Sequence, residues 1–176
     1  LQGVAMAKVA KDAGLKKVAI LYLNNDYGKG GRDNIQDLFA QKNVQVVAAE
    51  TYLGTDKDFK AQLTNIKAAN PDLIALVSYY TDAAAIAKQT RDLGINAPFV
   101  ALPSVHNPSL ISLGGNSVEG LTTLALFNQE KPTAALKSFT DKHKAKFAGK
   151  DIDSFTVLAY DAVKLLANAI EKSDGS

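Results

Sequence analysis

Short apolar segments and helical segments alternate along almost the whole chain. Strand-like apolar runs lie at residues 17–23, 44–52, 72–77, 98–102 and 120–126. The segments between them carry apolar residues at helical spacing, as Phe59, Leu63 and Ile66 do. Such alternation is typical of a parallel sheet with helices on both faces and right-handed crossovers. The sequence therefore predicts an α/β fold, a Rossmann-like parallel sheet flanked by helices.

The helices between and after these runs have recognisable starts and ends. They are expected over residues 4–13, 30–42, 59–69, 82–93, 108–113, 133–148 and 154–170. Thr55 followed by Asp58 resembles a capping box before the third of them. Asp82 is expected to cap the fourth helix. The glycines of residues 28–31 are interpreted as a flexible lead into the second helix.

Composition excludes several classes of function. The chain has 176 residues, of which 47% are hydrophobic, so it can hold a substantial core. Its formal net charge is +2 with no basic stripe, which argues against nucleic acid as a partner. It contains no cysteine, so disulfides, thiolate metal sites and a cysteine nucleophile are excluded. The sequence contains no run of 18 apolar residues, the length needed to span a membrane.

The segment NNDYGKGG, residues 24–31, resembles a phosphate-binding loop but fails both fingerprints. A Walker loop needs Gly-Lys followed by Ser or Thr, whereas Lys29 is followed by Gly30. A dinucleotide loop needs a third glycine where Asp33 stands. His106 and His143 have no metal-binding spacing. We therefore expect no catalytic residue, metal or cofactor, with a flavodoxin-like enzyme or nucleotide binder as the remaining enzymatic alternative.

The carboxyl ends of the predicted strands carry aromatic and hydroxyl side chains. In open parallel sheets ligands bind outside these ends. The candidates there are Tyr27, Tyr79, Tyr80, Thr81 and Ser104. Tyrosine offers an apolar face with a polar tip, which suits small organic ligands. Since neighbouring strand residues point to opposite sides, one of Tyr79 and Tyr80 is expected to face the ligand.

Several segments together resemble one family of transport proteins. They are GLKKVAILYLNNDYGKG, DKDFKAQLTNIKAANPDLIAL, AIAKQTRDLG, SVEGL and FTVLAYDAVKLLANAI. In this order they are similar to the solute-binding proteins of branched-chain amino acid ABC transporters. These have the type I periplasmic binding fold, with two α/β lobes joined by a hinge and ligand between the lobes.

The resemblance implies that this chain is a fragment. Residues 1–126 resemble the second ligand-binding lobe, and residues 127–176 resemble the hinge return and helices of part of the first lobe. The chain opens inside a helix, without Met or a signal peptide, as expected of an excised or processed piece. The last two helices would lack part of their packing surface. We therefore expect a swapped or dimeric arrangement, or docking against a further segment.

The resemblance also assigns ligand contacts. Tyr27 matches the aromatic residue of the D-Y-G turn, and Tyr79, or Tyr80 beside it, matches a second-lobe tyrosine. Phe155 matches an aromatic residue that approaches ligand from the hinge. The acid that pairs with a ligand ammonium in amino-acid binders would fall near Pro103 or Ser104, where no acid stands. Asp82 is the alternative acid, although capping is the preferred interpretation.

The function implied is that of an extracytoplasmic binding protein. It would bind a small amino acid, organic acid or amide and deliver it to the membrane permease of an ABC transporter. No covalent chemistry is involved, and the expected location is periplasmic. The alternative is a ligand-sensing domain of a regulator or receptor with the same fold.

Overall fold

The computed structural model describes residues 2–173, which divide into two units. The first comprises residues 2–124 and the second residues 125–173. The division lies close to the predicted boundary at residue 126, while the assignment of the units to two lobes stays a prediction.

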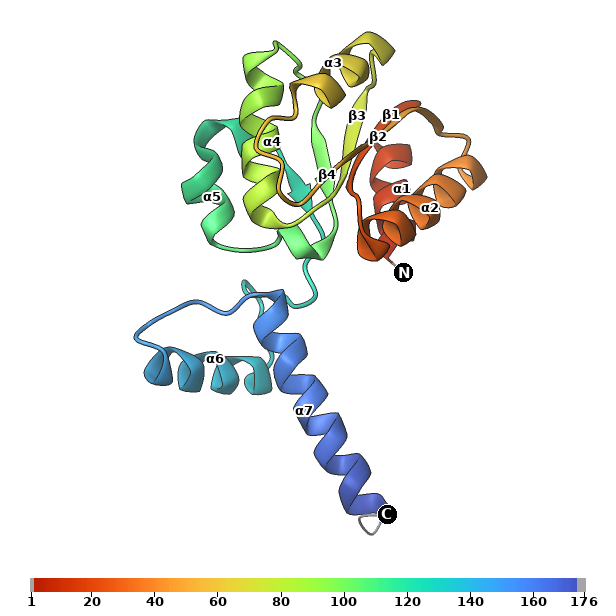
Figure 1. The fold of residues 1–176 in the computed structure, drawn as a ribbon. Helices are drawn as coiled ribbons and strands as arrows, with labels where there is room; N and C mark the ends of the chain where they lie inside the picture. The colour runs from red at the N-terminus through yellow and green to blue at the C-terminus, as the bar shows by residue number, and fades with distance from the viewer. Residues whose placement is uncertain (1, 174–176) are drawn as a thin grey trace. The chain divides into compact units, whose positions relative to one another are not determined.

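A five-stranded parallel sheet forms the centre of the first unit (Figure 1). Its strands are β1 (Lys17–Leu23), β2 (Gln45–Tyr52), β3 (Leu73–Val77), β4 (Phe99–Ala101) and β5 (Thr122–Thr123). Their order in space is β2-β1-β3-β4-β5. The chain thus reverses direction of travel between β1 and β3, which makes a switch point at their carboxyl ends. The α/β fold expected from the alternating pattern is confirmed.

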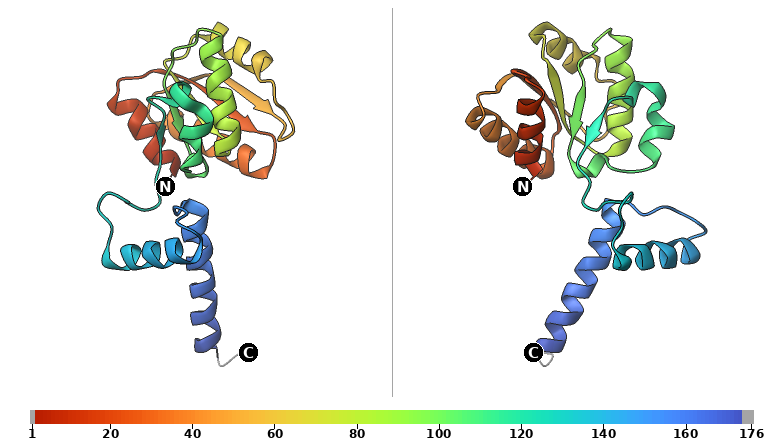
Figure 2. Two further views of the ribbon diagram at one scale, coloured as in Figure 1. Left: turned by 90° about the vertical axis from the view of Figure 1, so that its left-hand side faces the viewer. Right: turned by 180° about the vertical axis from the view of Figure 1, so that it is seen from behind.

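Helices cover both faces of this sheet, as Figures 1 and 2 show. The helices of the unit are α1 (Gln2–Asp12), α2 (Asp26–Gln41), α3 (Lys60–Ala69), α4 (Tyr80–Asp92) and α5 (Ser109–Gly114). Two short 3-10 turns, η1 (Pro103–Val105) and η2 (Gly115–Val118), complete it. Helices α1 and α2 pack on one face through Met6, Ile35 and Phe39. The remaining helices pack on the other face, where Leu63 and Ile86 meet the sheet. Every residue of β3 is buried, because the strand lies at the centre with helices on both sides.

The second helix begins earlier than predicted. It starts at Asp26, and the Asn25 side chain accepts a hydrogen bond from the backbone N–H of Gly28 at 2.8 Å. A Cβ atom on Gly28 would lie 1.7 Å from the carbonyl oxygen of Leu23, and one on Gly31 would lie 2.6 Å from Cγ1 of Val77. The interpretation of these glycines as a flexible lead is therefore wrong. Gly28 and Gly31 let the helix approach the sheet closely.

Two predicted caps are also wrong. Helix α3 begins at Lys60 after Phe59, without a side-chain cap, so Thr55 does not start it. Helix α4 begins at Tyr80 after Tyr79, which places Asp82 inside the first turn. Asp82 is therefore available for another interaction.

The last strand is shorter than the apolar run of residues 120–126 suggested, since only Thr122–Thr123 pair with β4.

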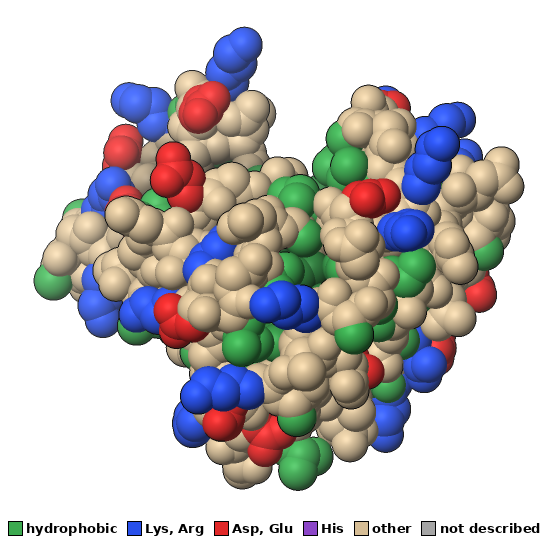
Figure 3. All heavy atoms as spheres, turned by 90° about the horizontal axis from the view of Figure 1, so that it is seen from above, with side chains coloured by type: hydrophobic (Ala, Val, Ile, Leu, Met, Phe, Trp, Pro, Cys, Tyr) green, Lys and Arg blue, Asp and Glu red, His purple; other side chains and the backbone are tan. Residues whose placement is uncertain are grey.

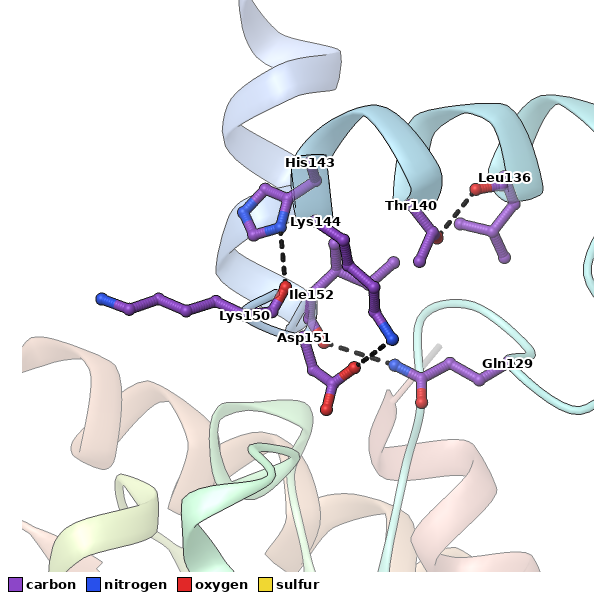
Figure 4. Close-up of polar contacts among 8 residues, drawn as sticks. All are labelled: Gln129, Leu136, Thr140, His143, Lys144, Lys150, Asp151 and Ile152. Carbon is purple, nitrogen blue, oxygen red and sulfur yellow. Dashed lines mark hydrogen bonds and ion pairs between the residues drawn. The ribbon is translucent and has the colours of Figure 1, made fainter. Parts of the chain in front are cut away.

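The second unit contains the helices α6 (Ala134–Lys146) and α7 (Ser154–Lys172). Thr133 and Asp153 cap them, accepting from the N–H groups of Leu136 and Thr156. The connection between them folds back on α6 (Figure 4): Nδ1 of His143 donates to the carbonyl of Lys150 at 3.1 Å, and Lys144 pairs with Asp151 at 2.8 Å. The rings of Phe139 and Tyr160 join α6 to α7, with centroids 4.6 Å apart.

Helix α7 has an uncovered apolar face. Except for Val157, which is partly buried, its large apolar side chains are exposed: Phe155, Leu158, Tyr160, Val163, Leu165, Leu166 and Ile170. Ser154 is the one buried residue of this helix, all of which the structure describes. Within residues 2–173, no helix combines the length and apolar character needed to cross a membrane.

Charged side chains of both signs are interspersed over the face drawn in Figure 3. This face is seen from above, relative to Figure 1. Lysine and arginine side chains there have acidic side chains nearby, and apolar side chains line the hollow at the centre of the view. The mixture agrees with the small net charge of +2 for the whole sequence.

Candidate functional site

Three neighbouring strands deliver tyrosine and serine side chains to one edge of the sheet. Tyr27 lies in the first turn of α2, directly after β1. Ser78 and Tyr79 connect β3 to α4, and Ser104 lies in η1 after β4. Because β1, β3 and β4 are adjacent and parallel, their carboxyl ends bring these residues together. We call Tyr27, Tyr79 and Ser104, together with the hydrogen-bonded pair Tyr52–Asp82, the rim cluster.

Two tyrosine rings of this cluster stack on one another. The ring centroids of Tyr27 and Tyr79 lie 5.5 Å apart with an interplanar angle of 21°. Tyr27 is half-buried against the α1–α2 side of the core, whereas Tyr79 is partly exposed. Stacked aromatic pairs hold one another in a fixed orientation. The pair therefore forms a firm aromatic wall at the edge of the sheet.

A chain of hydrogen bonds anchors this wall to the sheet. The Tyr27 hydroxyl is hydrogen-bonded to Oγ of Ser104. The Ser104 hydroxyl in turn donates to the backbone carbonyl of Ser78 at 2.7 Å. Burial raises the pKa of Tyr27, against the opposing effect of its hydrogen bond with Ser104. Tyr27 therefore stays protonated at neutral pH.

Tyr52 and Asp82 extend the cluster beyond the residues predicted from sequence. The Tyr52 hydroxyl donates to Oδ2 of Asp82 at 3.2 Å, and its ring meets Phe59 edge-on at 5.1 Å. Burial, followed by the negative charge of Asp82, raises the pKa of Tyr52 strongly. The position of Tyr52 at the carboxyl end of β2 was the signal that could have revealed it.

The other predicted site residues lie elsewhere. Tyr80 begins α4 and packs, partly buried, against the core formed with α3 and α4. Only Tyr79 of this pair therefore stacks on Tyr27, and Tyr80 stays a predicted contact. Phe155 belongs to α7 of the second unit and is half-exposed. Its ligand contact likewise stays a prediction.

Metal-ligating side chains do not gather in the part of the chain that the structure describes. No group of three or more His, Asp or Glu residues is placed to hold an ion among residues 2–173. The rim cluster instead combines aromatic faces, hydroxyl oxygens and one carboxylate. Such a set is suited to hydrogen bonding and to contact with a small organic molecule.

Comparison with known proteins decides the family. The family model described as Periplasmic binding protein matches residues 2–176. The chain belongs to this family. The expected resemblance to a type I periplasmic binding fold is thereby confirmed, together with its parallel sheet and flanking helices.

Relatives within the periplasmic binding protein family are named for branched-chain amino acids. The Leu/Ile/Val-binding protein of Citrobacter freundii is 28% identical over 174 residues, covering 98% of this chain and 47% of the relative. The crystal structure of the leucine-binding protein LivK from Thermotoga maritima superposes with a TM-score of 0.86 at 32% identity, covering 99% of this chain and 50% of that one.

A third relative was crystallised with a ligand. LivJ of Streptococcus pneumoniae, a branched-chain amino acid transporter substrate-binding protein in complex with isoleucine, has a TM-score of 0.80 at 30% identity. The match covers 96% of this chain and 49% of LivJ. This chain thus spans about half the length of each of these relatives.

Proposed function

We propose that this chain is part of an extracytoplasmic solute-binding component of an ABC transporter. It binds a small amino acid, or a related organic acid or amide, without covalent chemistry. The observation that carries the proposal is the stacked pair Tyr27–Tyr79, fixed by Ser104 at the carboxyl edge of the sheet. A rigid aromatic wall at this edge supports binding of a compact ligand because little ordering is needed on association.

The first unit supplies one wall of the binding site in this proposal. The chain matches about half the length of its relatives, so the complete gene product would provide the opposite wall. Ligand held between two walls favours closure by a hinge, since it contacts both only in the closed state. We assign three further contacts with the ligand or with this wall: Phe155, Tyr80 and Ser104.

The partner in this proposal is the membrane permease of the same transporter, and the compartment is periplasmic or extracytoplasmic. The relative LivJ, named as a branched-chain amino acid transporter substrate-binding protein, supports this assignment. A ligand-sensing domain of a regulator or receptor is the alternative. Transport of the bound compound that depends on this protein, measured with a gene deletion, distinguishes uptake from sensing.

Calorimetric titration of the complete gene product tests ligand binding. The panel contains aliphatic and aromatic amino acids, their amides and the corresponding organic acids. Tyr27→Ala and Tyr79→Ala should each weaken binding of the hit by about tenfold or more, because an aromatic contact is lost together with its stacking partner. Ile111→Ala, at an exposed position on α5, is the control and should leave the affinity unchanged.

Absence of binding across the whole panel would contradict the proposed function. If both tyrosine variants instead bind the ligand as tightly as the unmodified protein does, the rim cluster is not part of the binding site. The proposed solute-binding function of the complete protein would then still stand.

A further inference from the structure

The hydroxyl of Ser104 joins two loops that are far apart in the sequence. It donates its one hydrogen to the backbone carbonyl of Ser78 at 2.7 Å. The hydrogen bond between Tyr27 and Ser104 must therefore run from the Tyr27 hydroxyl to Oγ of Ser104. Ser104 thus holds the side chain of Tyr27, 77 residues away in the sequence, and the main chain of Ser78, 26 residues away.

The stacked tyrosine rings close these bonds into a loop of contacts. The carbonyl that Ser104 uses belongs to Ser78, and the next residue is Tyr79, whose ring centroid lies 5.5 Å from that of Tyr27. Contacts therefore run from Tyr27 to Ser104, then to the main chain before Tyr79, and through the stack back to Tyr27. The Ser104 hydroxyl takes part in two links of this loop, so its removal leaves the loop open.

The backbone around Ser104 is firmly attached to the sheet. Its neighbours Pro103 and Val105 are buried, and the N–H of Val105 donates to the carbonyl of Leu102 at 3.1 Å. Leu102 is itself buried, and its N–H donates to the carbonyl of Leu76 in β3 at 3.3 Å. Ser104 therefore offers the phenol an acceptor whose position is fixed by the core.

Both tyrosines of the stacked pair lie at the surface of the first unit. Tyr79 is 37% exposed, and Tyr27 is only partly buried. Side chains at a surface sample several rotamers, and ordering them when a ligand binds costs affinity. The bond from Tyr27 to Ser104 fixes one ring before a ligand arrives, and the stack passes this order on to Tyr79.

Little of the hydrogen-bonding capacity of Ser104 is left for a ligand. Its hydrogen goes to Ser78, and one of its two lone pairs accepts from Tyr27. A direct ligand contact would have to use the remaining lone pair. The bonds of Ser104 therefore favour a role behind the aromatic wall over a role as a primary ligand contact.

We propose that Ser104 is a positioning residue, which preorganises the Tyr27–Tyr79 pair for ligand binding and acts through Tyr27 rather than through a bond of its own to the ligand. This inference rests on the proposed function and assigns the role of one residue in the same site. It makes the orientation of the pair depend on a third loop, the one between β4 and α5. Ser104 then contributes to affinity only while the Tyr27 hydroxyl is present to be held.

Fluorine NMR of the ligand-free complete gene product tests the contact itself. The protein is labelled with 3-fluorotyrosine, and the Tyr27 resonance is identified by its loss in Tyr27→Phe. Ser104→Ala should shift this resonance, because the phenol loses its acceptor. Ser112→Ala, at an exposed serine on α5, is the matched control and should leave it in place. An unmoved Tyr27 resonance in a folded Ser104→Ala protein would overturn the inference before any ligand is added.

A double-mutant cycle in ligand affinity tests the role of Ser104. L-leucine is titrated calorimetrically into the unmodified protein, Tyr27→Phe, Ser104→Ala and the double variant, and the tightest-binding compound of the panel replaces it if leucine does not bind. Tyr27→Phe keeps the ring and removes only the hydroxyl. Each single variant should weaken binding by about fivefold, the effect of one lost hydrogen bond. Because both changes break the same link, the double variant should stay within about twofold of the weaker single variant.

The outcomes separate this inference from the function on which it rests. Effects that multiply in the double variant, to about 25-fold, would show that Ser104 acts independently of Tyr27 and would overturn the inference. Unchanged affinity in a folded Ser104→Ala protein would overturn it too, and both results leave solute binding intact. Melting temperatures report folding, and Ser104→Cys, whose thiol is a weak acceptor of similar shape, replaces Ser104→Ala if that variant does not fold. No binding by any compound of the panel would overturn the proposed function and the inference together.

Discussion

Strand β3 and helix α7 are both strongly apolar, yet their surroundings are opposite. All residues of β3 are buried between two helical layers, whereas α7 exposes nearly all of its large apolar side chains. An apolar pattern therefore indicates that a segment packs against another surface, but it does not identify that surface. In the first unit the flanking helices bury β3, whereas the second unit leaves the face of α7 available to another polypeptide surface.

Close packing of α2 against the sheet offers the most severe test of the first unit. Gly28→Ala would place a methyl carbon 1.7 Å from the carbonyl oxygen of Leu23, so the helix must move away. We expect destabilisation of about 4 kcal/mol or more, in the range that marks a structural conflict. Denaturant unfolding measures it.

Gly30→Ala is the matched control two residues along the same helix. A Cβ atom at Gly30 meets nothing within 4 Å, and alanine favours the helix. The variant should be neutral or more stable by up to about 1 kcal/mol. Equal behaviour of the two variants would show that the turn between β1 and α2 is not closely packed.

Truncating one leucine in each region tests the comparison directly. Leu76→Ala opens a cavity in a fully buried position of β3 and should cost about 2–5 kcal/mol. Leu166 on α7 is 62% exposed, so Leu166→Ala should change the free energy of unfolding by less than about 0.5 kcal/mol. Chemical denaturation of the 176-residue chain at low concentration measures both.

The contrast between a buried β3 and an exposed α7 would disappear if a second copy of the chain covered α7, as the predicted swapped or dimeric arrangement requires. Light scattering of the 176-residue chain would then show a dimer, and Leu166→Ala would cost more at high protein concentration than at low. Leu166→Lys should shift the chain toward monomer. A monomer at every concentration, with α7 ordered, would contradict the predicted association.

Sequence patterns were sufficient for the layers of the fold because burial on two faces leaves continuous apolar runs such as β3. They also placed Tyr27, Tyr79 and Ser104 at one edge, since parallel strands end together. They failed where the outcome depends on distance rather than on pattern. Gly28 and Gly31 of α2 looked like loop residues, although a side chain at either position would collide with the preceding strand or with a residue far along the chain.

The rim cluster shows the same limit at the level of single side chains. Aspartate is a residue type common at helix N-caps, and the local sequence does not show whether Asp82 lies at the capping position or in the first turn. Its actual partner, Tyr52, is 30 residues away in the sequence, and only the three-dimensional fold brings the two side chains together. The direction of the hydrogen bonds in the rim cluster follows from these contacts alone.

We expect the smallest change in stability from substitution of Asp72. This residue lies at the amino end of β3, the strand that also contains Leu76. Its Oδ2 accepts from the backbone N–H groups of Lys16 and Lys17 at 3.0 and 2.9 Å. These bonds lower the pKa of Asp72 from its ordinary value of 3.8. Because the folded value lies below the unfolded one, the stabilisation is present above about pH 4 and is lost as the pH falls through the folded pKa.

Asp72→Asn should therefore lower the melting temperature slightly at pH 7, and the difference from the unmodified chain should shrink toward pH 3 as the carboxylate becomes protonated. Asp37→Asn, at an exposed position on α2, controls for the loss of one surface charge. A difference at Asp72 that stays constant from pH 7 to pH 3 would mean that shape rather than charge links the start of β1 to β3.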